Sequence, residues 1–127
     1  MKIYCCGCKK YIVARLTDGK EVYPKGSSKS LPFWVCDACG GFVGCHHKTR
    51  NRTKPLGCIP TEEIKNARKE IHKIMDPLWR YDGWDRTTLY AEISASVGWE
   101  YHTAGIKNIE EARKVYRIVK KLRSESW

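Results

Sequence analysis

Two pairs of cysteines have the residue type and the spacing that metal binding requires. Cys5 and Cys8 form one Cys-x-x-Cys pair, and Cys36 and Cys39 form the second. Each pair suits a tight turn whose backbone N–H groups point at the thiolates. Two such turns at the ends of neighbouring hairpins produce a tetrahedral four-sulfur zinc site. We therefore predict structural zinc at these four cysteines; an iron site uses the same ligands, so the sequence leaves iron open.

The exact ligand set has alternatives within the chain. Cys6 is adjacent to Cys5, but Cys5 gives the first pair the same spacing as the second pair. Cys45, Cys58 and His46 are further substitutes, which we expect instead to be small buried thiols and a hydrogen-bonded histidine. A redox role is less consistent with the pattern, because two pairs occur and no thioredoxin-like βαβ pattern follows them.

A run of histidines and cations follows the second cysteine pair. It lies in residues 46–60, HHKTRNRTKPLGCIP, where neither the strand period nor the helix period is present, so a loop is expected. Arginine and lysine meet phosphate by charge, and threonine and asparagine add neutral donors. The run lacks the glycine pattern of a nucleotide P-loop. We interpret six residues as nucleic-acid-binding: His46, His47, Lys48, Arg50, Arg52 and Lys54.

The positive charge of the chain is concentrated in its N-terminal half. The formal net charge is +10 over 127 residues. Residues 1–58 have 11 Lys and Arg against 3 Asp and Glu, whereas residues 59–127 have 13 against 11. Four thiolates with one Zn²⁺ contribute about −2, which leaves the N-terminal half strongly basic. Such a surface favours a polyanionic partner, namely RNA, DNA or a ribonucleoprotein.

The cysteine content and the hydropathy pattern predict a cytoplasmic protein. The chain has seven cysteines, and its N-terminus, MKIYCCGCKK, has no apolar segment of a secretory signal. Free thiols and metal ligation are then more consistent with a reducing cytosol than a disulfide framework is. No stretch approaches the roughly 18 apolar residues of a membrane helix, so we expect no membrane partner.

The elements that must position the cysteines are short strands. An alternating run at residues 11–16 predicts a strand, Asp18-Gly19 a hairpin turn, and residues 21–23 the returning strand. Residues 33–35 and 42–44 are expected to be the strands that enter and leave the second cysteine pair.

The second half of the chain has helical periodicity. A helix is predicted from Thr61, with a break or restart at Asp76-Pro77. A second helix is expected from Asp85 to Gly98, and a third opens at an Asn108-x-x-Glu111 capping box variant. The predicted fold class is α+β: a zinc-ribbon-like β-hairpin module with the basic loop at residues 1–58, followed by about three α-helices at residues 59–127 that pack on it.

Several motifs together resemble a known family. The string WVCDACGGFVGCH, the basic loop with PLG, the helical segment IHKIMDPLW, and Arg86 and Tyr90 are similar to zinc-finger-containing proteins, of unassigned activity, found widely in phages and prophages. The resemblance covers roughly residues 3 to 122. It implies that the two cysteine pairs are the zinc ligands. The family's other motif positions correspond to Val43, Gly44, His46, Pro55, Leu56, Gly57, His72, Asp76, Pro77 and Trp79. Cys6 and His47 are additions to the family pattern.

Two other functions remain open alongside nucleic-acid binding. A phage-type protein could use the same basic surface to dock on a host protein complex. A metal-dependent nuclease could use His72 and Asp76, which lie four residues apart and share a helix face, with His46 and His102 as further acid–base groups. A four-cysteine zinc has no open coordination position for chemistry, and no acidic cluster accompanies the basic loop, so we favour a binding protein over an enzyme.

Overall fold

The computed structural model describes residues 1–27 and 29–125, which divide into two compact units. The N-terminal unit spans residues 1–61 and contains the strands, and the helical unit spans residues 62–127 and contains the long helices. The α+β fold class predicted from the sequence is confirmed. Across the described residues, no helix combines the length and apolar character needed to cross a membrane.

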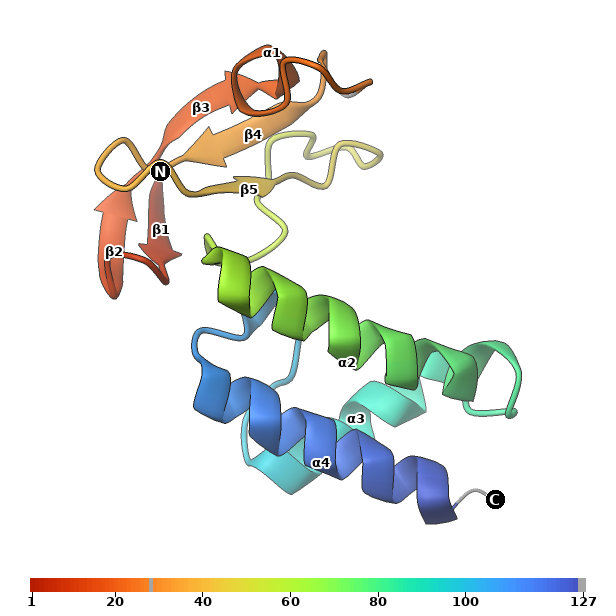
Figure 1. The fold of residues 1–127 in the computed structure, drawn as a ribbon. Helices are drawn as coiled ribbons and strands as arrows, with labels where there is room; N and C mark the ends of the chain where they lie inside the picture. The colour runs from red at the N-terminus through yellow and green to blue at the C-terminus, as the bar shows by residue number, and fades with distance from the viewer. Residues whose placement is uncertain (28, 126–127) are drawn as a thin grey trace. The chain divides into compact units, whose positions relative to one another are not determined.

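The N-terminal unit consists of a two-stranded hairpin and a three-stranded antiparallel sheet (Figure 1). In the hairpin, β1 (Lys2–Cys5) pairs with β2 (Lys10–Val13). In the sheet, β4 (Pro32–Val35) lies between β3 (Arg15–Asp18) and β5 (Phe42–Gly44). The first cysteine pair therefore lies at the turn between β1 and β2, and the second lies at the turn between β4 and β5. This is the arrangement of neighbouring hairpins that the cysteine spacing predicts.

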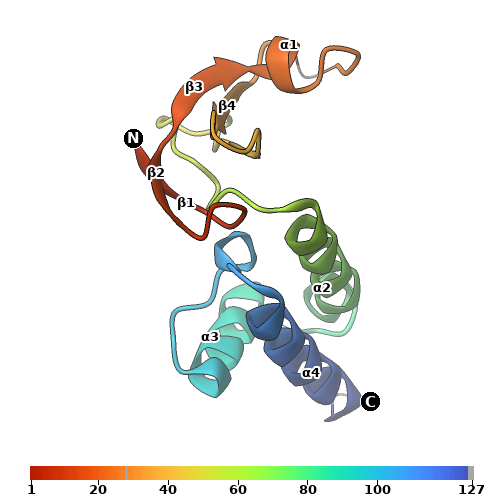
Figure 2. The ribbon, with the colours of Figure 1, turned by 60° about the vertical axis from the view of Figure 1, so that its left-hand side comes forward.

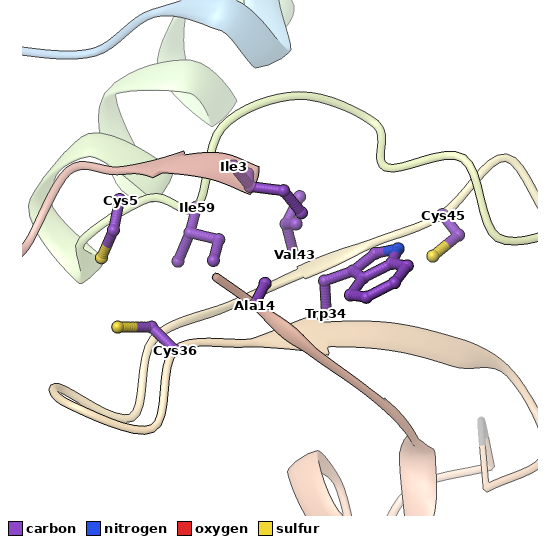
Figure 3. Close-up of a cluster of buried hydrophobic side chains, with 8 residues drawn as sticks. All are labelled: Ile3, Cys5, Ala14, Trp34, Cys36, Val43, Cys45 and Ile59. Atoms are coloured by element: carbon purple, nitrogen blue, oxygen red, sulfur yellow. The ribbon is translucent and has the colours of Figure 1, made fainter. Parts of the chain in front are cut away.

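A small core joins the hairpin to the sheet. Figure 3 shows its members, which lie in or next to the strands or in the segment after the basic loop: Ile3, Cys5, Ala14, Trp34, Cys36, Val43, Cys45 and Ile59. Ile59 is fully buried, and its carbonyl accepts a hydrogen bond from the Cys6 N–H at 2.8 Å. The Ile59 N–H in turn donates to the Tyr4 carbonyl at 2.9 Å. The chain thus returns from the basic loop to lie beside β1.

The strand predicted at residues 11–16 is interrupted at Ala14. β2 ends at Val13 and β3 begins at Arg15 in the other sheet. Ala14 itself is buried in the core, and its N–H donates to the Met1 carbonyl at 2.9 Å. A small side chain at this position lets the backbone change sheets without leaving a cavity.

The hairpin turn predicted at Asp18-Gly19 and the returning strand at residues 21–23 are wrong. Asp18 instead caps the short helix α1 (Gly19–Val22), and its carboxylate accepts a hydrogen bond from the Lys20 N–H at 3.0 Å. Asp is a favourable cap because it satisfies an N–H that has no partner within the helix. The strand that pairs with β3 is β4, which comes later in the sequence.

The helical unit contains α2 (Glu62–Arg80), α3 (Arg86–Val97) and α4 (Ile109–Glu125), with a 3-10 turn η1 (Thr103–Gly105) before α4. α4 packs against both α2 and α3 (Figure 2). Their apolar stripes, spaced as the sequence predicts, form the buried core: Ile64, Ile71, Met75, Leu78, Leu89, Ile93, Val97, Ala112, Val115 and Val119.

The predicted ends of α3 and the predicted start of α4 are confirmed. The Asp85 carboxylate caps α3 by accepting from the Thr88 N–H at 3.0 Å, and Gly98 ends it in the left-handed conformation, with φ of 89°. Asn108 accepts from the Glu111 N–H at 2.8 Å at the start of α4. The Glu111 carboxylate reaches back to the Lys107 N–H at 3.0 Å, one residue earlier than in the standard capping box.

The predicted break at Asp76-Pro77 is wrong, because α2 continues through Pro77 to Arg80. Pro77 lies near the C-terminal end of the helix, where it removes the N–H that would bond to the Lys73 carbonyl and its ring crowds that carbonyl. Two contacts favour continuation. Leu78 is fully buried, and the Trp79 indole N–H donates to the Asp76 carboxylate at 3.1 Å.

Candidate metal centre

The two hairpin turns bring four cysteine sulfurs together. The Sγ atoms of Cys5, Cys8, Cys36 and Cys39 all lie within 4.8 Å of one another. The closest pairs are Cys5 with Cys39 at 3.5 Å and Cys8 with Cys36 at 3.7 Å. A tetrahedral zinc with bonds of about 2.3 Å separates its sulfurs by about 3.8 Å. The four sulfurs therefore have the spacing of a zinc site, and a disulfide, with sulfurs about 2 Å apart, does not fit.

The two turns have the same backbone geometry, and we call them the first knuckle (Cys5–Cys8) and the second knuckle (Cys36–Cys39). The residue directly after each knuckle is left-handed, with φ of 57° at Lys9 and 78° at Gly40. Its N–H donates to the carbonyl of the first cysteine, at 2.8 Å for Lys9 and 2.7 Å for Gly40. Glycine adopts this conformation without strain, whereas a lysine does not.

Two glycines allow the chain to approach the sulfurs closely. A Cβ added to Gly7, within the first knuckle, would lie 3.3 Å from the Cys39 sulfur. A Cβ added to Gly41 would lie 3.0 Å from Ile59 Cγ2 and 3.4 Å from the same sulfur. The Gly41 N–H also points at Cys39 Sγ, at 3.4 Å. Glycine at both positions lets the metal site sit directly against backbone.

The thiols of the four cysteines differ in pKa. Burial opposes ionisation of Cys36, but hydrogen bonds from the Cys39 and Ala38 N–H groups and from neighbouring thiols outweigh it, and the pKa falls from 9.0 to about 7. The hydrogen bond with Cys36 raises the pKa of Cys8 to about 12, and burial raises the pKa of Cys5. A zinc ion would override these differences, because coordination deprotonates each cysteine ligand.

An arginine ties the second knuckle to the sheet. Arg15, on β3, contacts Asp37 of the second knuckle at 2.9 Å and Glu21 of α1 at 2.8 Å. Its hydrogen bonds lower the pKa of Glu21 from 4.5 to about 2 and also lower the pKa of Asp37. Arg15 therefore pairs with two of the three acidic residues of residues 1–58.

The remaining cysteines lie apart from the four-sulfur group. Cys6, which was an alternative to Cys5, has its sulfur 3.6 Å from that of Cys58, and both residues are buried. Cys45 lies at the opposite end of the core from Cys5 and Cys36, beside Trp34 (Figure 3). Burial raises its pKa. Neither these three cysteines nor His46 belongs to a metal-binding group among the described residues.

The basic loop, residues 46–54, is held at its base by the core. The Trp34 indole N–H donates to the Thr53 carbonyl at 2.6 Å. The His46 N–H donates to the Lys54 carbonyl at 2.8 Å, which closes the loop on itself. Within it, the Thr49 hydroxyl donates to the His46 carbonyl at 2.7 Å. These bonds use backbone carbonyls and leave the charged groups outside the anchoring network.

The cations of the basic loop face solvent. Lys48, Arg50, Arg52 and Lys54 are all exposed. Arg52 makes one long hydrogen bond, 3.4 Å, to the His47 carbonyl. In the part of the chain that the structure describes, no ion pair involves any of the four. Both histidines are half-buried, and His47 Nδ1 lies 3.3 Å from the Cys45 carbonyl, so His47 anchors the loop.

Two of the residues considered for a nuclease, His72 and Asp76, lie together on α2, whereas His46 lies in the basic loop and His102 precedes η1. His72 Nδ1 is 3.3 Å from Asp76 Oδ1, as their spacing predicts. The same Asp76 oxygen accepts the Trp79 indole N–H, so the carboxylate links side chains of one helix. Among the described residues, the four cysteines are the only group of three or more metal-ligating side chains.

The sequence interpretation missed the residues that support the metal centre. Three of these residues have direct structural roles: Arg15, Gly7 and Gly41. A fourth, Ile59, hydrogen-bonds the last segment of the unit to Tyr4 and Cys6. The glycines had a visible signal, because each lies within two residues of a ligand in the sequence. No local signal in the sequence marks Arg15 or Ile59, since they act through partners that are distant in the chain.

Comparisons with known proteins agree with the geometry of the metal centre. Neither the curated proteins nor the solved structures gave a match to this chain. The model of one protein family, DUF3268, described as a zinc-finger-containing domain, matches residues 1–124. This match and the cluster of four cysteines together support zinc as the metal. The chain therefore belongs to the DUF3268 family of zinc-finger-containing domains.

Proposed function

We propose that the N-terminal unit binds nucleic acid, RNA or DNA, free or within a ribonucleoprotein, through the basic loop. The observation that carries this proposal is the exposure of four cations on an anchored loop with no acidic partner among the described residues. A phosphate backbone is a partner that such a loop suits, because each phosphate can be neutralised by one cation. Zinc has a structural role here: it holds the two hairpins that position the loop.

Charge elsewhere in the unit supports the same partner. Arg15 pairs with both Glu21 and Asp37, which leaves Asp18 as the one acidic residue of residues 1–58 outside this cluster. Asp18 caps α1. The three carboxylates are thus engaged away from the loop, and among the described residues none of them forms an ion pair with a loop cation. Within the described part of the chain, no disulfide involves any of the seven cysteines, which supports action in a reducing, cytoplasmic setting, including the host cytoplasm of a phage or prophage protein.

The test is the salt dependence of binding to a fluorescein-labelled oligonucleotide, followed by anisotropy between about 50 and about 200 mM salt. Four neutralised phosphates give a slope of log K against log salt of about −3 to −4. Replacing Arg50 and Arg52 by Gln should reduce the magnitude of that slope by about 1.5 to 2. A matched control replaces Lys20 and Lys25, two exposed cations outside the loop, by Gln.

The control removes the same amount of positive charge as the loop variant does. Because this charge lies outside the loop, the control should leave the slope nearly unchanged. Equal effects of the two double variants would show that net charge, and not the loop, determines binding. No binding to single-stranded or duplex oligonucleotides at low salt would overturn the proposal. In that case, a partner recovered from cells after nuclease treatment would favour docking on a host protein complex.

A further inference from the structure

The outward face of the β1–β2 hairpin has an unusual composition. Side chains alternate across a strand, so the register places Lys2, Tyr4, Tyr11 and Val13 on one face. The opposite face carries Ile3, Cys5 and Ile12, which pack in or against the core beside the zinc ligands. The outward face is therefore held flat by the metal centre but does not contribute to the core.

Its aromatic side chains remain accessible. Tyr11 is 63% exposed and Val13 is 76% exposed. Tyr4 lies directly across from Tyr11, and their rings meet edge to face at 5.4 Å with an angle of 78° between the planes. This contact orients the Tyr11 ring while most of the residue stays in water. An oriented, exposed aromatic ring on a rigid strand suits the stacking of a flat ligand.

The surroundings of this face are positively charged. Residues 1–13 contain Lys2, Lys9 and Lys10 and no acidic residue. Lys9 and Lys10 are exposed at the turn end of the hairpin. Lys9 is also left-handed, where the equivalent position of the second knuckle has Gly40. Lys9 therefore has a backbone strain that a glycine would not have, and such strain is typical of functional positions.

We propose that this face, which we call the stacking face (Lys2, Tyr4, Tyr11 and Val13), binds unstacked bases of a single-stranded nucleic acid. This inference rests on the proposed function and specifies its ligand as single-stranded. Aromatic rings stack on any base, and neighbouring lysines neutralise the phosphates that follow the strand. A duplex keeps its base faces inside, so it gains nothing from Tyr11. Base stacking then adds to the charge attraction of the basic loop.

The test separates bases from phosphates by using two labelled probes of about 12 nucleotides, a dT oligomer and an abasic oligomer of the same length. The wild-type protein should bind dT more tightly than the abasic chain at the same salt concentration. Tyr11→Leu, which keeps an apolar side chain on the strand, should lose about 5- to 150-fold in affinity for dT. The abasic probe and a duplex should bind Tyr11→Leu and wild type equally, and the salt slope should not change.

Three further measurements make the result decisive. Tyr11→Phe should keep the preference for dT, because the ring carries the stacking. Leu16→Ala, at an exposed apolar residue of the other sheet, should bind as wild type does. Zinc content measured on each variant reports whether the unit is folded. Equal affinity of the wild type for dT and the abasic chain would overturn this inference while leaving the proposed function intact. Absence of binding to all three probes would overturn both.

Discussion

The left-handed residue after each knuckle provides a sharp test of the metal centre. Gly40 has φ of 78°, and a Cβ added there would have no atom within 4 Å. The change Gly40→Ala therefore introduces backbone strain without a steric clash. Gly98, at the end of α3, has φ of 89° and equally open surroundings, but it belongs to the helical unit.

The size of the effect follows from the backbone conformation. A left-handed residue other than glycine costs about 1–2 kcal/mol. Replacing glycine also removes about 0.4–1 kcal/mol of unfolded-state entropy, which partly offsets the strain. The net cost is about 1 kcal/mol. Because folding of a small zinc module is coupled to metal binding, this cost should weaken zinc binding by about fivefold.

Competition with a chromogenic chelator measures the zinc dissociation constant of each variant. Gly40→Ala should weaken zinc binding about fivefold, whereas Gly98→Ala should destabilise α3 and leave zinc binding unchanged. Lys9→Gly is the reverse change and should keep or tighten zinc binding. The reasoning fails if Gly40→Ala and Gly98→Ala affect zinc equally, or if Lys9→Gly releases the metal.

Other residues give predictions of different kinds. Trp34→Phe removes the indole hydrogen bond to the Thr53 carbonyl, and we expect faster amide hydrogen exchange in the basic loop while zinc is retained. The same exchange pattern in both proteins would contradict this anchoring role. Asp85→Ala should lower the stability of the helical unit by about 1 kcal/mol, measured by denaturant unfolding, because the Thr88 N–H loses its cap. Cys6→Ser should leave one zinc per chain in native mass spectrometry; loss of the metal would show that the assigned ligand set is wrong.

The metal centre was predictable because its ligands form a pattern that is local in the sequence. Cys-x-x-Cys spacing places two sulfurs at one turn whatever the rest of the chain does, and only the pairing of the two turns needed the tertiary structure. Helix caps at Asp85 and Gly98 were predictable for the same reason, since a cap acts within four residues.

Features that depend on distant partners were not predictable. Asp18-Gly19 has the local signal of a hairpin turn, but the strand that pairs with β3 comes from residues 32–35, and Asp18 becomes a helix cap. Pro77 has the local signal of a helix break, yet the burial of Leu78 outweighs the loss of one hydrogen bond. In both cases tertiary packing determined the local conformation.

The return of the chain at Ile59 couples metal binding to ligand binding in the N-terminal unit. Ile59 exchanges backbone hydrogen bonds with Cys6 and Tyr4, so the segment that closes the basic loop is bonded to the knuckle that supplies two cysteines of the metal centre. A ligand held by the loop and a metal held by the cysteines then act on one folding equilibrium. Each must raise the affinity for the other by the same factor. Under the proposed function, zinc supply would in this way set how much nucleic acid the loop holds, and bound nucleic acid would slow the escape of the metal to cellular chelators.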